Sequence, residues 1–409
     1  MKFLPSVRSL AVTDALHLPC HLLLHPAHSE ALNSDSDSFS FFVLFLRSRS
    51  SFSFFVLVLV LVPVLVLLCS SMKTRLLSPL LFFASLAVLA LLVTAPALRA
   101  AADPAVKLTP LADRVRVEIG GQLFTEYIYR GASRPYLYPV NAVDGTSLVR
   151  DFPMKDTPGE DHDHKHHRAL MFVHSDVNKI DFWNEGTAGT KFPKGDTVND
   201  GIVEAQSGDV GLLRVKNRWL SPDGKLIATD DTTLRFRGHA HARTLDYEVT
   251  IHAQPGTPLV LGDNKDGTMS IRVAQWMNAP RKEKGKDIPG AGTIITANGE
   301  RNGAAWGKRA PWCDYSAPKD GKTYGIAIFD HPQNLRHPTW WMAREYGLFA
   351  ANPFGQKDFE PAAKHPAGQG DYTVPAGGNL TLRYRFYFHS GDEKSGKVAE
   401  AYAAYAAGK

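Results

Sequence analysis

One segment, residues 160–185, holds the densest set of titratable side chains in the sequence. It begins EDHDHKHHR, so four histidines and two aspartates fall within Asp161–His167, and Arg168 follows. Burial of such groups without partners is costly, so we expect them to be exposed, paired or gathered at a site. The chemistry that they offer is proton transfer near neutral pH, contact with sugar hydroxyls, or metal binding.

The spacing of the histidines predicts which of them act together. On an extended strand alternate side chains share a face, which here would carry His162, His164, His166, Arg168 and His174. A divalent metal would be held by His162, His164 and His166, because His-x-His on a strand can chelate an ion. General acid–base catalysis would use His162, His166 or His167. A solvated polar loop is the third interpretation, and the residues leave all three open.

Aromatic residues beside charged ones form the second chemical signal. The combinations are Trp183 with Glu185, Trp312 with Asp314 and Tyr315, and Trp341 with Arg344 and Tyr346. Core packing is the ordinary role of tryptophan, but an aromatic face beside a carboxylate or guanidinium also suits a sugar ring. We expect about half of these aromatics to line a cleft, with Glu185 or Asp314 moving protons and Arg168 and Arg344 neutralising negative charge.

The elements that position these residues are predicted to be β-strands, since apolar and polar residues alternate along much of the chain after residue 102. The expected strands are 115–119, 123–129, 135–139, 169–174, 211–220, 225–238, 245–253, 269–277, 324–330 and 380–389. The loop GDNKDG at 262–267 reads most simply as a hairpin turn. One helix is expected, at 396–409, with Val398, Tyr402 and Tyr405 on one face. These features predict one all-β domain, a large antiparallel sandwich or barrel with a short C-terminal helix.

The N-terminal part reads as targeting sequence and not as part of that domain. Residues 72–102 have a basic start, an apolar stretch and a small-residue end, the pattern of a signal peptide. We interpret 1–71 as a wrongly assigned upstream extension, and 103–409 as the single mature domain. The alternative is a membrane anchor at 52–68. The signal peptide predicts a secreted or periplasmic protein.

The composition of the mature region limits its partners. Of the 46 basic and 41 acidic residues, seven and four lie before residue 103, which leaves a net charge of about +2. That balance argues against nucleic acid or an acidic membrane surface as partner. Only Cys313 remains, so no internal disulfide forms, and no apolar stretch after residue 102 is long enough to span a bilayer. The sequence does not indicate an oligomeric state.

Four ordered motifs resemble a known family. They are DHDHKHHRALMFVHSDVNKIDFW, GDNKDG, WGKRAPWCDY and WWMAREYGLFAANPFG. Together, and across Arg134–His389, the chain resembles exported bacterial proteins of unknown function that carry the label "methane oxygenase PmoA-like". The label itself conflicts with the sequence, because that oxygenase chemistry belongs to membrane-spanning helices and this chain reads as strands.

The resemblance implies a set of site residues and a kinship with sugar-processing β-sandwich proteins. The residues that it implies are His162, His166, His167, Arg168, Trp183, Glu185, Asp263, Lys265, Asp314, Tyr315, Arg344 and Tyr346. Family members tend to have histidine where this chain has Met342, which removes one candidate ligand or base.

We therefore expect an exported carbohydrate-active protein, a lyase, hydrolase or epimerase that acts on a small sugar or oligosaccharide. Its fold would be a sandwich of the mutarotase-like supersandwich kind. Two alternatives stay open: a sugar-binding module without catalysis, and a metal-dependent oxidoreductase with a histidine-rich site. A divalent metal is the one cofactor that the sequence suggests, and whether any cofactor is bound stays open.

Overall fold

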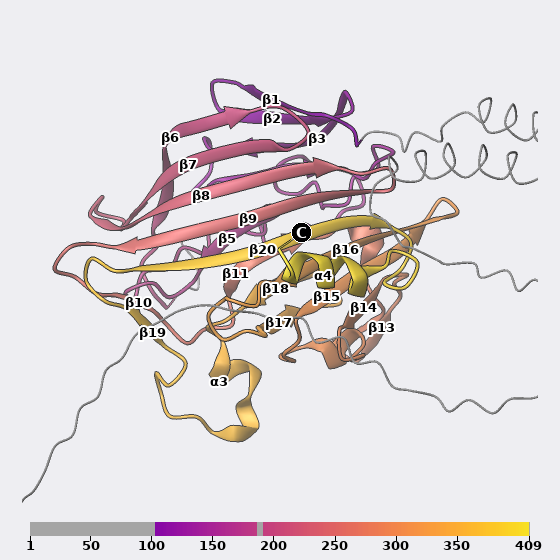
Figure 1. Ribbon diagram of the computed structural model, residues 1–409. Coiled ribbons are helices and arrows are strands. Elements are labelled where there is room, and N and C mark those ends of the chain that lie inside the picture. Colours follow the sequence, from indigo (N-terminus) through magenta and orange to yellow (C-terminus); the bar gives the residue numbers. More distant parts are fainter. Residues whose placement is uncertain (1–102, 186–190, 409) are drawn as a thin grey trace, which may run out of the picture. The chain divides into compact units, whose positions relative to one another are not determined.

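The computed structural model describes residues 103–185 and 191–408. The predicted extension 1–71 and signal peptide 72–102 lie outside the described residues. Two eight-stranded antiparallel sheets form the fold, and the long strands β7, β8, β9 and β20 lie side by side in one of them (Figure 1). The prediction of an all-β antiparallel sandwich is confirmed.

The first sheet has the strand order β1-β2-β3-β4-β5-β11-β18-β17. Its strands are β1 (Val106–Pro110), β2 (Arg114–Ile119), β3 (Gln122–Ile128), β4 (Tyr136–Val140), β5 (Leu170–His174), β11 (Gly267–Arg272), β17 (Trp340–Ala343) and β18 (Leu348–Asn352). The segments that form the centre of this sheet are distant in the sequence, so the sheet brings together the loops that precede and follow them.

The second sheet has the order β14-β15-β16-β20-β9-β8-β7-β6. Its strands are β6 (Asp196–Gln206), β7 (Gly211–Leu220), β8 (Leu226–Gly238), β9 (Ala242–Ala253), β14 (Thr293–Thr296), β15 (Trp312–Lys319), β16 (Lys322–Asp330) and β20 (Asn379–Ser390). Two short pairs complete the strands: β10 (Leu259–Leu261) with β19 (Tyr372–Val374), and β12 (Arg281–Glu283) with β13 (Lys286–Ile288). Within the described residues the helices are α3 (Gln356–Phe359), α4 (Val398–Ala406) and the 3-10 turns η1 (Gln275–Met277), η2 (Asn302–Ala305) and η3 (Pro361–Ala363).

The main core lies between the two sheets. Alternate residues of β7, β8, β9 and β20 are buried, as expected for strands with one face on a core. Phe124 of the first sheet contacts Phe236 and Phe388 of the second edge-on, with ring centroids 6.2 and 5.5 Å apart. Each such side chain contributes roughly 1.5–3 kcal/mol by burial.

A second apolar cluster covers the outer face of the first sheet. It contains Ile128, Tyr136, Met171, Val173, Trp183, Trp340, Met342, Leu348, Ala350 and Phe359. Every residue of β5, β11 and β18 is buried, including the polar Thr268, Ser270 and Arg272 of β11. Loops cover this outer face, and they carry most of the residues that the sequence analysis singled out.

The C-terminal helix α4 packs on the outer face of the second sheet. Val398 and Tyr405 are buried beside Phe329, and Tyr402 packs against the same cluster. The predicted helix and its apolar face are confirmed. No helix in residues 103–185 or 191–408 is long and apolar enough to cross a membrane.

Candidate functional site

A cavity of about 320 Å³ lies on the outer face of the first sheet, and we call it the outer-face cavity. Its lining residues are His164, His166, His167, Trp183, Asn184, Lys265, Asp266, Met342, Arg344 and Tyr346. They come from four places: the loop before β5, the loop after β5, the loop before β11, and the end of β17 with its connection to β18. Three of the four predicted motifs therefore meet at one cavity.

The histidine-rich segment is an irregular loop, because a buried arginine binds its backbone. Arg150, only 1% exposed, donates hydrogen bonds to the carbonyl oxygens of Asp161 (3.2 Å), Asp163 (2.9 Å) and His164 (3.2 Å) and to the carboxylate of Asp163. These bonds hold the backbone out of a strand conformation, since His164 has a φ of 42°, outside the extended region. The predicted alternation of side chains from His162 to Arg168 is therefore wrong, since β5 begins only at Leu170.

His162 is the histidine that this loop removes from the cavity. Its ring stacks on Phe152 at 4.4 Å, and its Nε2 lies 3.1 Å from a carboxylate oxygen of Asp156. The predicted metal set of His162, His164 and His166 is therefore not assembled. Within the part of the chain that the structure describes, no group of three or more His, Cys, Asp or Glu side chains is placed to hold a metal ion.

A second buried arginine, Arg272 of β11, fixes His167. Its guanidinium lies 3.0 Å from Asp163 Oδ1, 3.3 Å from His167 Nδ1 and 4.6 Å from the ring centroid of Tyr346. A guanidinium only donates, so Nδ1 of His167 accepts and its ring proton is assigned to Nε2. Burial, with the neighbouring His166 and Arg272, holds the pKa of His167 well below its usual range. His167 is thus a neutral, oriented imidazole.

His166 is the imidazole with the greatest freedom to meet a ligand. Burial and then the charge of Arg134 lower its pKa to about 3, so it is neutral at physiological pH. Its ring lies edge-on to His167 and Trp183, at 4.4 and 6.0 Å, and no other described residue forms a hydrogen bond with it. Its nitrogen lone pair is available to accept a hydrogen bond from a ligand.

Tyr346 lines the cavity next to His164. Their rings are parallel at 5.3 Å, and His164 is also parallel to His167 at 4.8 Å. Burial raises the pKa of the Tyr346 phenol against the opposing effect of Arg272 and Arg344, so the phenol keeps its proton at neutral pH. This side of the cavity offers an O–H donor.

Lys265 and Asp266 supply charge from the loop before β11. Lys265 Nζ lies 2.9 Å from Asp266 Oδ1, and Asp266 is the only carboxylate among the lining residues. The neighbouring Asp263 faces away and accepts hydrogen bonds from the backbone N–H groups of Lys357 and Gly370, at 3.0 and 3.2 Å. Asp263 therefore holds the loop in place. The hairpin interpretation of this loop is wrong, because β10 pairs with β19 and β11 pairs with β5 and β18.

Arg344 is the second cation of the lining. Its guanidinium carbon lies 3.4 Å from the ring centroid of Trp306, a close cation–π contact. Among the described residues no carboxylate pairs with it. Met342, on the preceding strand β17, fills the position where the family resemblance implies a histidine.

Glu185 and Arg168 form a buried ion cluster beside the cavity and do not line it. Arg168 binds Glu185 through Nε and Nη2 at 2.7 and 2.9 Å, and Arg134 Nη2 lies 2.8 Å from the same carboxylate. Burial opposes the charge on Glu185, but its two arginine partners outweigh burial and lower the pKa. A carboxylate held in this way is poorly suited to exchange protons.

Four further predicted residues lie away from the cavity. Trp341 faces the core between the sheets, and its Nε1 donates to Ala310 O at 2.9 Å. On β15, alternation sends Tyr315 into that core, whereas Trp312 and Asp314 lie on the other face.

The polar groups of β15 have structural partners. The Tyr315 hydroxyl donates to Glu345 O at 2.9 Å. Asp314, which is fully buried, lies 2.9 Å from His389 Nε2. Both residues therefore support the fold, and Tyr315 also anchors the connection that carries Arg344 and Tyr346.

Sequence reasoning missed Asp266, Asn184, Arg150 and Arg272. The first two stand inside motifs that were already noted, beside Lys265 and Trp183. A signal for Arg272 exists, since it is the only charged residue in the stretch GTMSIRVAQWM and a charge in an apolar strand needs a partner. We find no comparable signal for Arg150.

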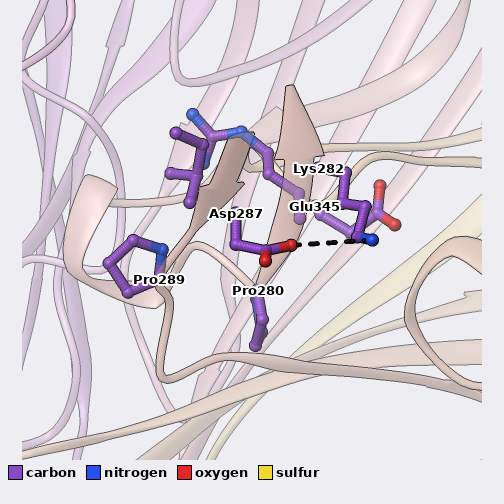
Figure 2. Close-up of a pocket in the computed structure, with 7 residues that line it drawn as sticks. Pro280, Lys282, Asp287, Pro289 and Glu345 are labelled. Atoms are coloured by element: carbon purple, nitrogen blue, oxygen red, sulfur yellow. Dashed lines mark ion pairs between the residues drawn. The ribbon is translucent and has the colours of Figure 1, made fainter. Parts of the chain in front are cut away.

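A second hollow, of about 490 Å³, lies beside the hairpin of β12 and β13. Figure 2 shows Lys282 and Asp287 facing each other across it, with Glu345 nearby. The Lys282–Asp287 distance is 3.9 Å, and the two side chains are 81% and 86% exposed. Exposed pairs of this kind contribute little, so this hollow is a solvated charged surface.

Comparisons with solved structures find similarity to sugar-related proteins at low identity. They include an α-galactosidase from Lactobacillus brevis (10% identity, 70% of this chain, 39% of that chain, TM-score 0.31). The galactosidase domain of the α-galactosidase–sucrose kinase AgaSK is 8% identical (70% of this chain, 40% of that chain, TM-score 0.28). A protein assigned as an aldose 1-epimerase from Escherichia coli K12 is 10% identical (70% and 99%, TM-score 0.26). The chain spans about two fifths of the two galactosidase chains.

No curated protein matches the sequence. A family match is found over most of the described region, from the start of β2 into α4, and it includes every lining residue of the outer-face cavity. The "PmoA-like" label and export remain predictions. Residues 114–403 match a family of unknown function, DUF6807, and the chain belongs to that family.

Proposed function

We propose that this protein is a carbohydrate-processing enzyme whose substrate binds in the outer-face cavity. One observation carries the proposal: the cavity combines a proton acceptor, a proton donor and two cations from four separate segments of the chain. A simple sugar-binding module would use an exposed aromatic face, and the lining of this cavity does not provide one. Trp183 is only 1% exposed and presents an edge to the histidines.

The proton acceptor and donor are His166 and Tyr346. Burial pushes their pKa values in opposite directions, which leaves His166 without a proton and Tyr346 with one. Such divergence assigns roles: the imidazole removes a proton from the substrate and the phenol supplies one. Asp266 is the alternative acceptor, because it is the one carboxylate of the lining.

These roles favour a lyase or an epimerase over a hydrolase. Glycoside hydrolysis in its usual form needs two carboxyl groups across the scissile bond, and the lining supplies one. A lyase or epimerase instead removes a proton from carbon beside a carbonyl or carboxyl group. The proton passes to His166, and the electron pair moves onto the oxygen of that group, where Arg344 and Lys265 offset the charge.

A second candidate is a sugar-binding protein without turnover. The low pKa of His166 favours it, because an imidazole that resists protonation is a weak base. In both cases we propose that the protein acts outside the cytoplasm, on the basis of the signal-peptide pattern at 72–102.

The test is hydrogen exchange into candidate sugars followed by proton NMR in D2O. Removal and return of a carbon-bound proton replaces it with deuterium, so its signal disappears. We expect His166→Gln and Tyr346→Phe to slow exchange by about 10²- to 10⁴-fold. Glu204→Gln, on the exposed side of β6, is the matched control. Wild-type rates in the His166→Gln variant would exclude His166 as the base, and tight binding without exchange would indicate the binding protein.

A further inference from the structure

We propose that the outer-face cavity selects an acidic sugar, a uronate, and that Arg344 binds its carboxylate. This inference rests on the proposed function, since it names the substrate class of the same site. It concerns the one formal charge of the lining that has no partner.

The charges of the lining do not balance. Lys265 and Asp266 neutralise each other at 2.9 Å. Arg272, behind Tyr346, pairs with Asp163 at 3.0 Å, a carboxylate that it shares with Arg150. Arg344 alone has no carboxylate partner in residues 103–185 or 191–408. The cavity therefore has an excess positive charge where a ligand would lie, and a ligand with one negative charge would complete it.

Arg344 is held in a defined orientation. Its guanidinium lies over Trp306 at 3.4 Å, and Trp306 is in turn packed edge-on against Phe359 with ring centroids 5.1 Å apart. Stacking uses the flat face of the guanidinium and leaves its N–H edge available. That edge matches the two oxygens of a carboxylate, which lysine cannot reproduce.

The backbone that carries Arg344 is also fixed. Its N–H donates to Leu348 O at 2.8 Å, and Gly347 N–H donates to Arg344 O at 2.9 Å, which closes the turn between β17 and β18. The Tyr315 hydroxyl binds the carbonyl of Glu345 from the core side. The cation is therefore positioned before a ligand arrives, which reduces the entropy lost on binding.

The other lining residues suit a hydroxylated ring more than a simple anion. His166, the Trp183 indole and the Tyr346 phenol offer both acceptors and donors around Arg344. The volume of about 320 Å³ is at the small end of ligand pockets and suits a single sugar unit.

The experiment compares D-galacturonate with D-galactose, which differ only in a carboxylate for a hydroxymethyl group. Titration calorimetry of the whole mature chain at low ionic strength gives both affinities. We expect D-galacturonate to bind about 10- to 100-fold more tightly, as for a charge-assisted hydrogen-bond pair. Arg344→Gln should abolish this preference, and Arg344→Lys should restore only part of it. Lys225→Gln, the same charge change in an exposed turn on the other sheet, should leave it intact.

The outcomes separate this inference from the proposed function. If both sugars bind equally, or Arg344→Gln keeps the preference, acid selection is refuted while the sugar site stands. If acetate competes as well as D-galacturonate, the cavity is an anion site without sugar recognition, and the inference is refuted. If no sugar binds and His166→Gln leaves the hydrogen-exchange rate unchanged, the proposed function is refuted. This inference is then refuted with it.

Discussion

The ion cluster at Glu185 gives the sharpest prediction, because it separates a structural role from the catalytic role that the sequence favoured. In Glu185→Gln the side chain keeps its size and loses its charge. Arg134 and Arg168 then keep positive charges without a counterion. Their side chains are 1% and 17% exposed, and that of Glu185 is 12% exposed, so water cannot replace the lost carboxylate.

The expected cost follows from this burial. Removal of one partner from a buried ion pair costs about 3–5 kcal/mol. Glutamine retains one oxygen acceptor, and Arg134 still donates to the carbonyl oxygens of Phe182 and Trp183 at 2.8 and 2.7 Å. We therefore expect the lower end, about 3 kcal/mol. For a domain of this size that loss lowers Tm by about 6 °C.

Urea unfolding and thermal unfolding at several pH values measure the effect. Because the folded-state pKa of Glu185 is lowered, its contribution is present above the unfolded pKa of about 4.3 and is lost as pH falls through the folded pKa. The difference between wild type and Glu185→Gln should thus be largest near neutral pH and should shrink on acidification.

A matched surface pair provides the control. Glu204 lies 3.6 Å from Arg214, and their side chains are 36% and 54% exposed. Glu204→Gln should change stability by no more than about 1 kcal/mol. The structural role is refuted if Glu185→Gln unfolds like Glu204→Gln. A loss of turnover in Glu185→Gln with wild-type stability and affinity would instead indicate a catalytic role for Glu185.

Two further predictions concern histidines. The folded-state pKa of His166, about 3, lies below the unfolded value of about 6.5, so wild-type stability should fall as pH is lowered between these values. His166→Gln should show a flatter pH dependence, and equal slopes in urea unfolding from pH 7 to 4 would contradict this. For His389, burial is outweighed by Asp314 and the pKa is raised, so the pair stabilises most below about pH 6.5 and less as pH rises through the raised pKa. Asp314→Asn should lose about 3 kcal/mol of stability at pH 6 with sugar affinity unchanged, and a loss of affinity in the folded variant would place Asp314 in the site.

Strand alternation made most of the sandwich predictable. Strands such as β7, β8 and β9 have one face on the core, so their sequences alternate and their positions are read directly. Strand β18, buried on both faces like β5, was missed because LFAAN has neither alternation nor a β-branched residue to indicate a strand. The edge strand β6 was missed because DTVNDGIVEAQ is polar on both faces and pairs with a single neighbour. Periodicity reports one-sided burial and little else.

Most residues of the site were predicted correctly. The residues that were assigned to it wrongly are directed elsewhere by tertiary contacts. His166, Trp183, Lys265, Arg344 and Tyr346 do meet at one cavity. Their neighbours Glu185 and Trp341 do not line it, since Glu185 is bound by Arg134 and Trp341 points to the core. Contacts between segments about thirty to fifty residues apart decide these cases, and spacing along the chain cannot show them.

The outer-face cavity lies on the far side of the first sheet from the main core, and this has a consequence for protein engineering. Of its ten lining residues, none belongs to the cluster between the two sheets. Positions such as His166, Lys265 and Arg344 can therefore be randomised together in a library while the sandwich stays as an unchanged scaffold. The limits of such a library are the buried arginines Arg150 and Arg272, which hold the loop that any new specificity would have to use.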